Sequence, residues 1–232
     1  SGSIKLGSGD VSGEGIAGSI SLIAGNSQTG IGGGINLKSG SSAGQRGGSI
    51  SIKSGVGKTS SGKLSLSTAN TNGNSGSISL ASGSSVDFPS GNVEFSSGDS
   101  VANAGSISFV AGSSSTDVGA SVEFQAGSSE QQTGGSVILK SGRSMQAISG
   151  SLEMTTSEGI TGSGHIVVNS GFSSDGSSGS VELSTGTSSE IAGNIKVKVG
   201  ASAIAGSIAM SAGSSTSVSG GNFRIAAGNG IG

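Results

Sequence analysis

The sequence predicts an all-β protein, a single parallel β-solenoid of about 16 coils with 13–16 residues per coil. Such a rod would be two-faced, with a narrow aliphatic core and no inserted loops. Three observations predict it: a small residue recurs every 13–16 residues, apolar side chains occupy two fixed positions after it, and a glycine follows most of these apolar stretches. The repeats leave no room for a second domain, so we expect residues 1–232 to form one continuous array.

Sixteen repeats align on this pattern, and each begins with glycine or, once, with alanine. In chain order these first positions are Gly2, Gly18, Gly33, Gly48, Gly62, Gly76, Gly91, Gly105, Ala120, Gly135, Gly150, Gly164, Gly179, Gly193, Gly206 and Gly221. The third and fifth positions are apolar in all 16 repeats, as in Ile20 and Leu22 of the second repeat. The eighth position is glycine except at Ala69 and Ser157.

Each repeat begins with the pattern of a half-buried strand. Apolar residues at every second position lie on one face of a strand, and many of these residues are β-branched. Glycine at both ends of the stretch permits a positive φ or a cramped backbone at a bend. We therefore expect one coil per repeat: a strand, a corner, a short return segment and a second corner. The third and fifth side chains would point inward and stack on the next coil at about 4.8 Å.

The composition fits neither of the usual glycine-rich classes. The chain has 47 glycines but one proline, and it has no three-residue glycine period, so it is not collagen-like. Chains rich in glycine and serine are often disordered because they bury too little apolar surface. The regular placement of the apolar residues argues against disorder, provided that many repeats stack to bury them.

Net charge and hydropathy limit the classes of partner that we expect. The formal net charge is −2 and no basic cluster exists, so we expect no nucleic-acid partner. No apolar run reaches the length of about 18 residues that a membrane-spanning helix needs, so we expect no membrane insertion. The chain has no cysteine, and therefore no disulfide framework is expected.

We find no candidate catalytic, cofactor or metal site, and we expect the protein not to be an enzyme. Solenoid enzymes enclose substrates with long inserted loops, whereas the longest interval in this chain is 16 residues. His165, the single histidine, takes a second position that is serine in ten other repeats, and it lacks a companion at metal-ligand spacing. The glycine-aspartate pairs at Asp10 and Asp99 are too few for the repeated turns of a calcium-binding β-roll.

The return segments are less regular than the strands. Their scattered apolar residues are expected to form a second, shorter face: Val86, Phe88, Val101, Val118, Ile148, Ile160, Ile191, Ile204 and Val218. Serine pairs follow the corner glycine in several repeats: Ser84 and Ser85, Ser113 and Ser114, Ser128 and Ser129, and Ser214 and Ser215. These serines predict a repeated turn held by hydroxyl hydrogen bonds rather than a binding site.

Two rows of side chains concern neighbouring repeats. Phe95, Phe109 and Phe124 occupy the fifth position of three consecutive repeats and are expected to stack inside the rod. At the outward fourth position, glutamates fall on every second repeat: Glu94, Glu123, Glu153 and Glu182, separated by Ser108, Ile138 and Val167. This alternation would double the distance between like charges to about 9.6 Å and so weaken their repulsion.

The pattern of glycine, strand and glycine resembles β-solenoid repeat arrays of the extracellular structural and adhesin type. The resemblance covers the whole chain and concerns architecture; it points to no single family and implies no functional residues. Members of this broad class include microbial adhesins, extracellular fibres and some ice-binding proteins. The resemblance implies an extracellular or cell-surface location.

The first functional hypothesis is a structural one: a segment of a filament, sheath or adhesin stalk that extends by stacking coil on coil. The first and last repeats carry no cap over their strand edges, and exposed edges pair with further chains. We therefore expect the protein's partner to be itself, through end-to-end stacking or a longer array. The expected assembly ends are Ile4 and Leu6 at one end and Phe223 and Ile225 at the other.

The alternative hypothesis is binding to ice or another flat surface, such as a glycan or a mineral. Outward serine pairs at the second and fourth positions form the candidate surface: Ser19 and Ser21, Ser49 and Ser51, Ser77 and Ser79, and Ser106 and Ser108. Lys63, Asn92 and Glu94 interrupt this row, which argues against a flat ice-binding array.

Overall fold

Regular secondary structure is absent from the part of the chain that the structure describes. The computed structural model describes residues 2–229, and this range contains no α-helix and no β-strand. The predicted array of residues 1–232 extends beyond the described residues at both ends. Extended chain is interrupted once per repeat by a bend, at residues 12–15, 28–30, 43–45, 58–59, 72–73, 86–88, 101–102, 115–117, 130–132, 145–147, 160–161, 174–176, 189–190, 203–204 and 216–218.

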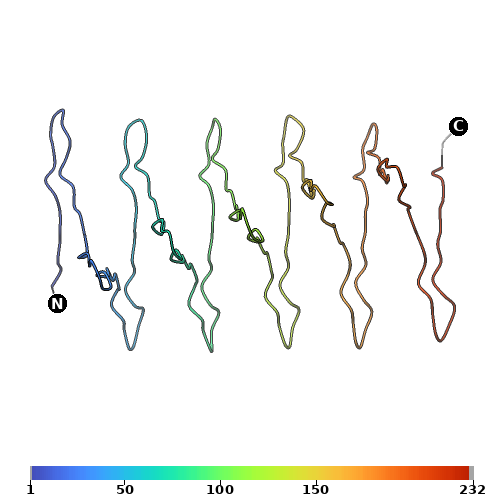
Figure 1. Ribbon diagram of the computed structural model, residues 1–232, viewed down its shortest axis with the longest axis horizontal. Helices are drawn as coiled ribbons and strands as arrows, with labels where there is room; N and C mark the ends of the chain where they lie inside the picture. Colours follow the sequence, from blue (N-terminus) through green and yellow to red (C-terminus); the bar gives the residue numbers. More distant parts are fainter. Residues whose placement is uncertain (1, 230–232) are drawn as a thin grey trace. The chain divides into compact units, whose positions relative to one another are not determined.

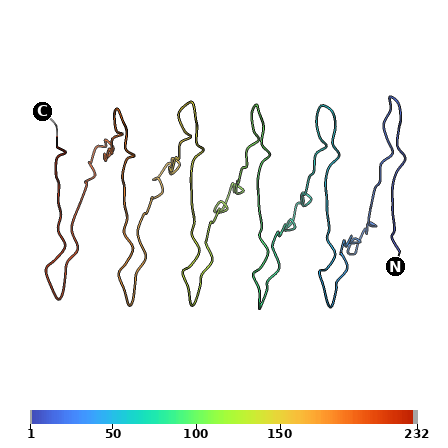
Figure 2. The same ribbon diagram turned by 180° about the vertical axis from the view of Figure 1, so that it is seen from behind.

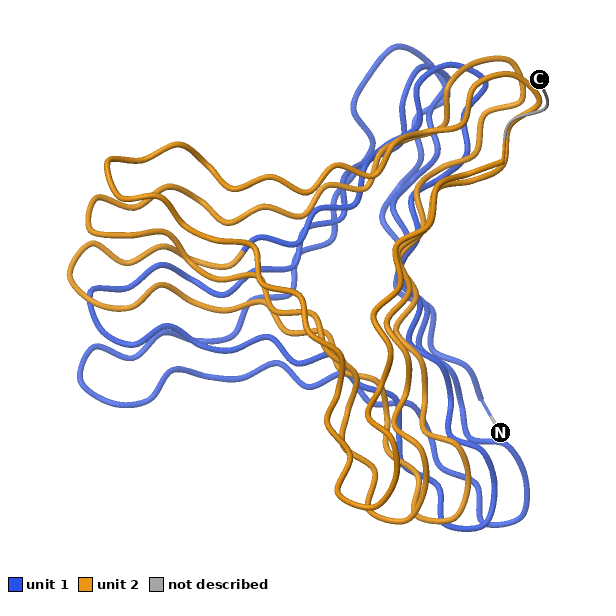
Figure 3. Cartoon of the chain, turned by 90° about the vertical axis from the view of Figure 1, so that its right-hand side faces the viewer, with its two compact units in different colours: residues 1–110 blue, residues 111–232 orange. Residues whose placement is uncertain are grey.

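The chain divides into two units, Ser1–Val110 and Ala111–Gly232, which we describe separately. In each unit, straight stretches of chain alternate with narrow-necked loops, as the two opposite views in Figures 1 and 2 show. Viewed along its axis, each unit has loops that point in three directions, with extended chain running from one corner to the next (Figure 3). The prediction of one continuous array stays a prediction.

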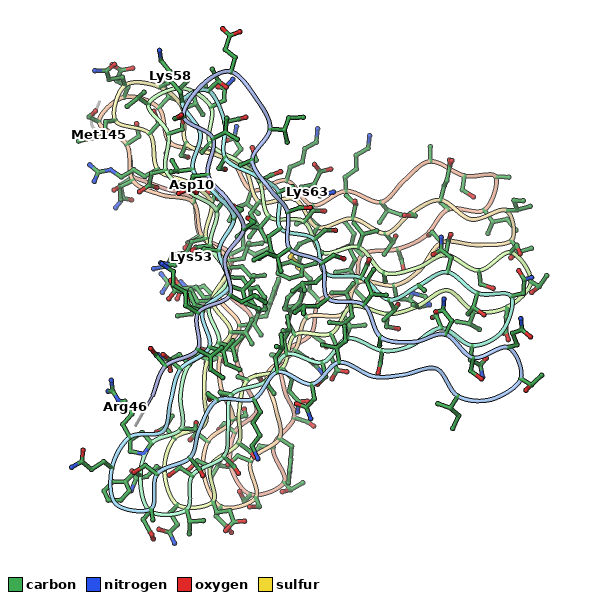
Figure 4. The ribbon with its side chains drawn as sticks, turned by 90° about the vertical axis from the view of Figure 1, so that its left-hand side faces the viewer. Asp10, Arg46, Lys53, Lys58, Lys63 and Met145 are labelled. Carbon is green, nitrogen blue, oxygen red and sulfur yellow. The ribbon has the colours of Figure 1, made fainter. Side chains whose placement is uncertain are left out.

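One repeat supplies one side and one corner of this arrangement. We call residues from the first to the eighth position the extended segment, and residues from the eighth position to the next first position the corner loop. In the second repeat these are residues 18–25 and 25–33. Three labelled lysines trace one such corner in Figure 4: Lys53 lies before it, Lys58 near its tip and Lys63 after it.

The predicted β-solenoid is therefore wrong. It required each repeat to close a full coil and to pair with the next repeat, but no strand or sheet forms within the described residues. What we predicted to be a return segment is a corner loop, so the following repeat lies on another side of the unit instead of on top of its predecessor (Figure 3). Because consecutive repeats do not lie one above the other, they cannot form a backbone ladder with each other.

The predicted aliphatic core is also absent. No side chain is buried in the described part of the chain, and the third and fifth positions remain at least 48% exposed. The apolar residues expected to form a second face lie in the corner loops and are 79–110% exposed. Two apolar side chains per repeat point inward from a single layer of chain, and nothing from a neighbouring turn covers them.

The sequence predicted two possible reasons for glycine at the ends of each extended stretch: a positive φ or a crowded backbone. The structure supports only the second reason. None of the described glycines has a positive φ, so left-handed backbone is not what places them. Close approach of the backbone explains the glycine at some of the first positions, such as Gly18, Gly33, Gly48 and Gly135. A Cβ on Gly33 would lie 3.2 Å from the backbone nitrogen of Gly25 and 3.3 Å from the Cβ of Ala24, whereas a Cβ on Gly25 would meet nothing within 4 Å. Nothing in the structure requires glycine at that eighth position.

Candidate assembly surface

The corner loops are closed by their own backbone. Eight hydrogen bonds run from the first-position N–H of one repeat to the eighth-position carbonyl of the repeat before it, at 2.8–3.3 Å. They join Gly18 to Gly9, Gly33 to Gly25, Gly48 to Gly40, Gly62 to Gly55, Ala120 to Gly112, Gly135 to Gly127, Gly150 to Gly142, and Gly221 to Gly213. All eight of these bonds close a corner loop within the described residues.

A hydroxyl at the tenth position caps the bend inside most corner loops. In 12 repeats this residue is serine or threonine, and its oxygen accepts a hydrogen bond from a backbone N–H two or three residues later, at 2.8–3.4 Å. The residues are Ser27, Ser42, Thr71, Ser85, Ser100, Ser114, Ser129, Ser144, Ser173, Ser188, Ser202 and Ser215. The predicted turn-forming role of Ser85, Ser114, Ser129 and Ser215 is thus confirmed.

Within residues 2–229, two repeats have glycine at the tenth position, and they turn differently. A Cβ on Gly57 would collide with the carbonyl oxygen of Ser60, and a Cβ on Gly159 with that of Gly162. In these two loops the chain folds back so tightly that the carbonyl three residues later occupies the space of a side chain. The tenth position therefore selects one of two turns: a hydroxyl-capped bend, or a tighter bend that only glycine permits.

Side-chain packing adds to these hydrogen bonds at the base of several corners. The side chain at the seventh position lies against the next first-position glycine; a Cβ on Gly48, for example, would lie 3.3 Å from the Cβ of Ser39. The Ser39 hydroxyl also donates a hydrogen bond of 3.0 Å to the Gly48 carbonyl, and Ser8 donates one of 2.7 Å to Gly18. The half-buried residues of the described chain are found at the seventh and tenth positions: Ala24, Ser39, Ala111, Ala126, Ser144 and Ser173.

The extended segments, in contrast, are shielded only by the adjacent repeat in the chain. Ile4 in the first repeat is 100% exposed, whereas Ile20 in the second is 51% exposed, because only Ile20 has a repeat before it in the described chain. At the other end, Ile225 lacks a described repeat after it and is more exposed than other fifth-position residues. The repeats at the two ends of the described chain therefore leave an apolar side chain more exposed than the repeats between them do.

Phe95 and Phe109 illustrate this contact between adjacent repeats. Their ring centroids lie 6.5 Å apart at an interplanar angle of 88°, an edge-to-face arrangement. We expected these rings to stack one above the other; instead they meet across the inside of the unit from two sides. Both rings remain more than half exposed, so the pair does not amount to a core.

The structure places the predicted serine surface on the extended segments of alternate repeats. All eight serines are exposed. They belong to the second, fourth, sixth and eighth repeats, all within the unit Ser1–Val110, and consecutive repeats lie on different sides of that unit (Figure 3). The binding role of these serines stays a prediction. The predicted assembly ends Ile4, Leu6, Phe223 and Ile225 are all exposed too, and their role also stays a prediction.

Chemistry-bearing groups do not cluster in the part of the chain that is described. No group of three or more His, Cys, Asp or Glu side chains there could hold a metal ion. His165 is exposed. A hollow at the eleventh corner loop is lined by Glu158, Gly159 and Ile160, and thus contains one carboxylate and no second titratable group. Over the same residues, no helix is long and apolar enough to cross a membrane.

The tenth position carries a signal that the prediction of a return segment did not use. This residue is serine or threonine in 12 repeats and glycine in three more. Alignment of the repeats at that position, as at the third and fifth, indicates that each supposed return segment is a capped turn.

Comparison with known proteins finds no match: no protein-family model, no curated protein and no solved structure is similar to this chain. The resemblance to extracellular repeat arrays therefore stays a prediction.

Proposed function

We propose that the protein is a structural repeat element that assembles with copies of itself to form a filament, sheath or stalk. One observation carries the proposal: the extended segments present apolar third and fifth positions that are about half exposed or more in every repeat. Apolar surface of this extent and regularity is typical of a surface that another chain covers.

The backbone of the extended segments supports the same function. Buried backbone N–H and carbonyl groups need partners, and an extended chain with free groups on both edges pairs readily with other extended chains. The hydrogen bonds of the structure, over residues 2–229, lie in the corner loops or at their bases. The corners are thus satisfied within one chain, and the extended segments need other chains.

Sedimentation velocity over a range of concentrations tests this function. We expect the 21.7 kDa chain to be a minor species at micromolar concentrations, with electron microscopy showing rods or filaments. A polar cap containing proline, appended to either end, tests the role of Ile4, Leu6, Phe223 and Ile225, because it would shorten rods that grow end to end. A chain that sediments as a monomer at all concentrations would overturn the proposal.

A further inference from the structure

We infer that three copies of the chain interleave, each laying its extended segments into the spaces between successive turns of the other two. The inference rests on the proposed function and adds to it a stoichiometry and a register. It follows from the number of repeats per turn, the separation of the turns and the area that has to be covered.

The first observation is that a turn contains three repeats. In the unit Ser1–Val110, Asp10 of the first repeat and Lys58 of the fourth lie at the same group of corner loops, whereas Arg46 of the third lies at another (Figure 4). The corner loops of the unit Ala111–Gly232 likewise point in three directions (Figure 3). If a unit is rotated about its axis by one third of a turn, each side therefore takes the position of the next side. Each repeat likewise takes the position of its neighbour.

The second observation is that successive turns do not pair as strands within the described residues. Paired extended chains lie about 4.8 Å apart, with opposite Cα atoms roughly 4.5–5.5 Å apart. In this chain few Cα atoms that are 12 or more residues apart in sequence come within 8 Å of each other. Within each unit, the ribbon of one turn does not run against that of the next (Figure 1), and the third- and fifth-position side chains stay at least 48% exposed.

The third observation is the area that a partner has to cover. The chain exposes 23684 Å², whereas a compact monomer of this mass exposes about 9,000 Å². More than half of the exposed surface must therefore be covered before the chain becomes as compact as an ordinary protein. An end-on contact of standard size buries about 1,600 Å² in total, which is far too little. Only partners that run along each unit, between its turns, can cover such an area.

Three copies satisfy these requirements with a single symmetry. We place the second and third copies by rotating the first about its axis by one third and by two thirds of a turn. Each side of the assembly then holds extended segments from all three chains in turn. Along that side the repeats follow in numerical order: one repeat from the first chain, the next repeat from the second chain, and the next from the third. Each space between turns then holds two extended segments, and every repeat has the same surroundings, as closed cyclic symmetry requires. Backbone hydrogen bonds form between chains, and third and fifth positions adjoin third and fifth positions throughout.

The charge pattern fits this register. In one chain by itself, the nearest repeat on the same side is the third one along, so the alternation of glutamates between adjacent repeats would have no effect. With three interleaved copies, repeats adjacent in number become neighbours on each side. The glutamates at the fourth position then alternate with uncharged residues, and Lys196 follows Glu182.

The mass of the assembly gives the first test. Light scattering on the native protein should show a species of three times 21.7 kDa, or multiples of it where rods join end to end. A stable species of two chains would overturn the threefold inference and leave the proposed function standing. A monomer would overturn both.

Engineered disulfides give the second test, and the natural absence of cysteine makes them unambiguous. Ser65 and Ser79 occupy the fourth position of the fifth and sixth repeats. Interleaving places Ser65 of one chain next to Ser79 of another at about 4.8 Å, within disulfide range. Oxidation of the double variant Ser65→Cys and Ser79→Cys should therefore link three chains covalently on a non-reducing gel.

A matched variant distinguishes interleaving from a chain that collapses on itself. Ser108 occupies the same position one turn after Ser65. Interleaving holds these two residues about 14 Å apart, beyond the reach of a disulfide, so Ser65→Cys with Ser108→Cys should give no cross-link. Cross-linking of this second pair within one chain, or failure of the first pair to cross-link, would overturn the inference.

Discussion

The corner loops and the extended segments differ in the interactions that stabilise them. A corner loop contains its own hydrogen bonds: a carbonyl-to-amide bond at its base, a hydroxyl cap at its tenth position, and a small side chain packed against glycine. An extended segment has apolar side chains that stay about half exposed or more, and it forms no strand within the described residues. The loops are therefore local structures, whereas the extended segments become stable only through assembly. Substitutions in the two regions should differ accordingly.

The largest effect should come from a charge at an inward fifth position. Leu80→Asp places a carboxylate where the extended segments meet, and burial of an unpaired charge is costly. We expect the concentration for half-assembly to rise at least about 100-fold, measured by sedimentation. Val86→Asp introduces the same charge at a corner loop and should change assembly little, because Val86 is 99% exposed. Equal effects of the two variants would contradict the contrast between the regions.

The next largest effect concerns a substitution that makes one repeat resemble the majority. Gly57→Ser restores the common tenth-position residue, yet its Cβ would collide with the Ser60 carbonyl oxygen. The loop must change its bend, and we expect a loss of about 1–3 kcal/mol in the urea unfolding of the assembly. Gly55→Ala in the same loop is the control, since a Cβ there meets nothing within 4 Å. If Gly57→Ser stabilises the protein, the two-turn description is wrong.

Gly33→Ala and Gly25→Ala compare the two glycines at the base of one corner. The first adds a Cβ 3.2 Å from a backbone nitrogen, which must shift by a few tenths of an ångström, so it should cost about 1 kcal/mol more than the second. The second adds a Cβ into open space and restricts the unfolded chain, so its effect should stay within about 1 kcal/mol, with either sign. Thermal unfolding midpoints of the two variants, measured at equal concentration, check this order. A larger loss for Gly25→Ala would contradict it.

The smallest effect should be the loss of one turn cap. The Ser114 hydroxyl accepts hydrogen bonds from the N–H groups of Thr116 and Asp117, at 3.4 and 2.9 Å. Ser114→Ala should cost about 1 kcal/mol or less, because the loop is exposed and water replaces part of the cap. Hydrogen exchange should become faster at the Asp117 amide while assembly persists. Ser113→Ala, next to it, should leave that amide unchanged.

The sequence predicted those features that depend on near neighbours along the chain. Serines after a glycine, as at Ser85, predicted a turn because a short hydroxyl side chain reaches the N–H three residues on. Alternating apolar residues, as at Ile20 and Leu22, predicted half-buried strands, which was wrong, because no strand forms there and both side chains stay exposed. The repeated first-position glycine predicted a cramped backbone, and Gly33 shows that crowding without a positive φ.

The pairing of the extended chain could not be predicted in the same way. A strand pattern indicates which side chains share a face, but it does not say which segment lies beside it. We paired each repeat with the next, and the candidate rows of serines, phenylalanines and glutamates were interpreted on that basis. The structure turns the chain at each corner, so that the first and fourth repeats share a group of corner loops while the third lies at another (Figure 4).

By itself, the sequence determined the repeat length, the two apolar positions and the residues that form each turn, because these depend on interactions within about ten residues. Only the tertiary structure decided that a repeat makes one side of a turn instead of a whole coil. This outcome depends on the direction in which the chain leaves each corner loop. A small difference in the φ and ψ angles of a few loop residues, repeated at every corner, decides whether the next extended segment returns above the last one or continues to a new side. That direction left the third and fifth positions uncovered in the single chain.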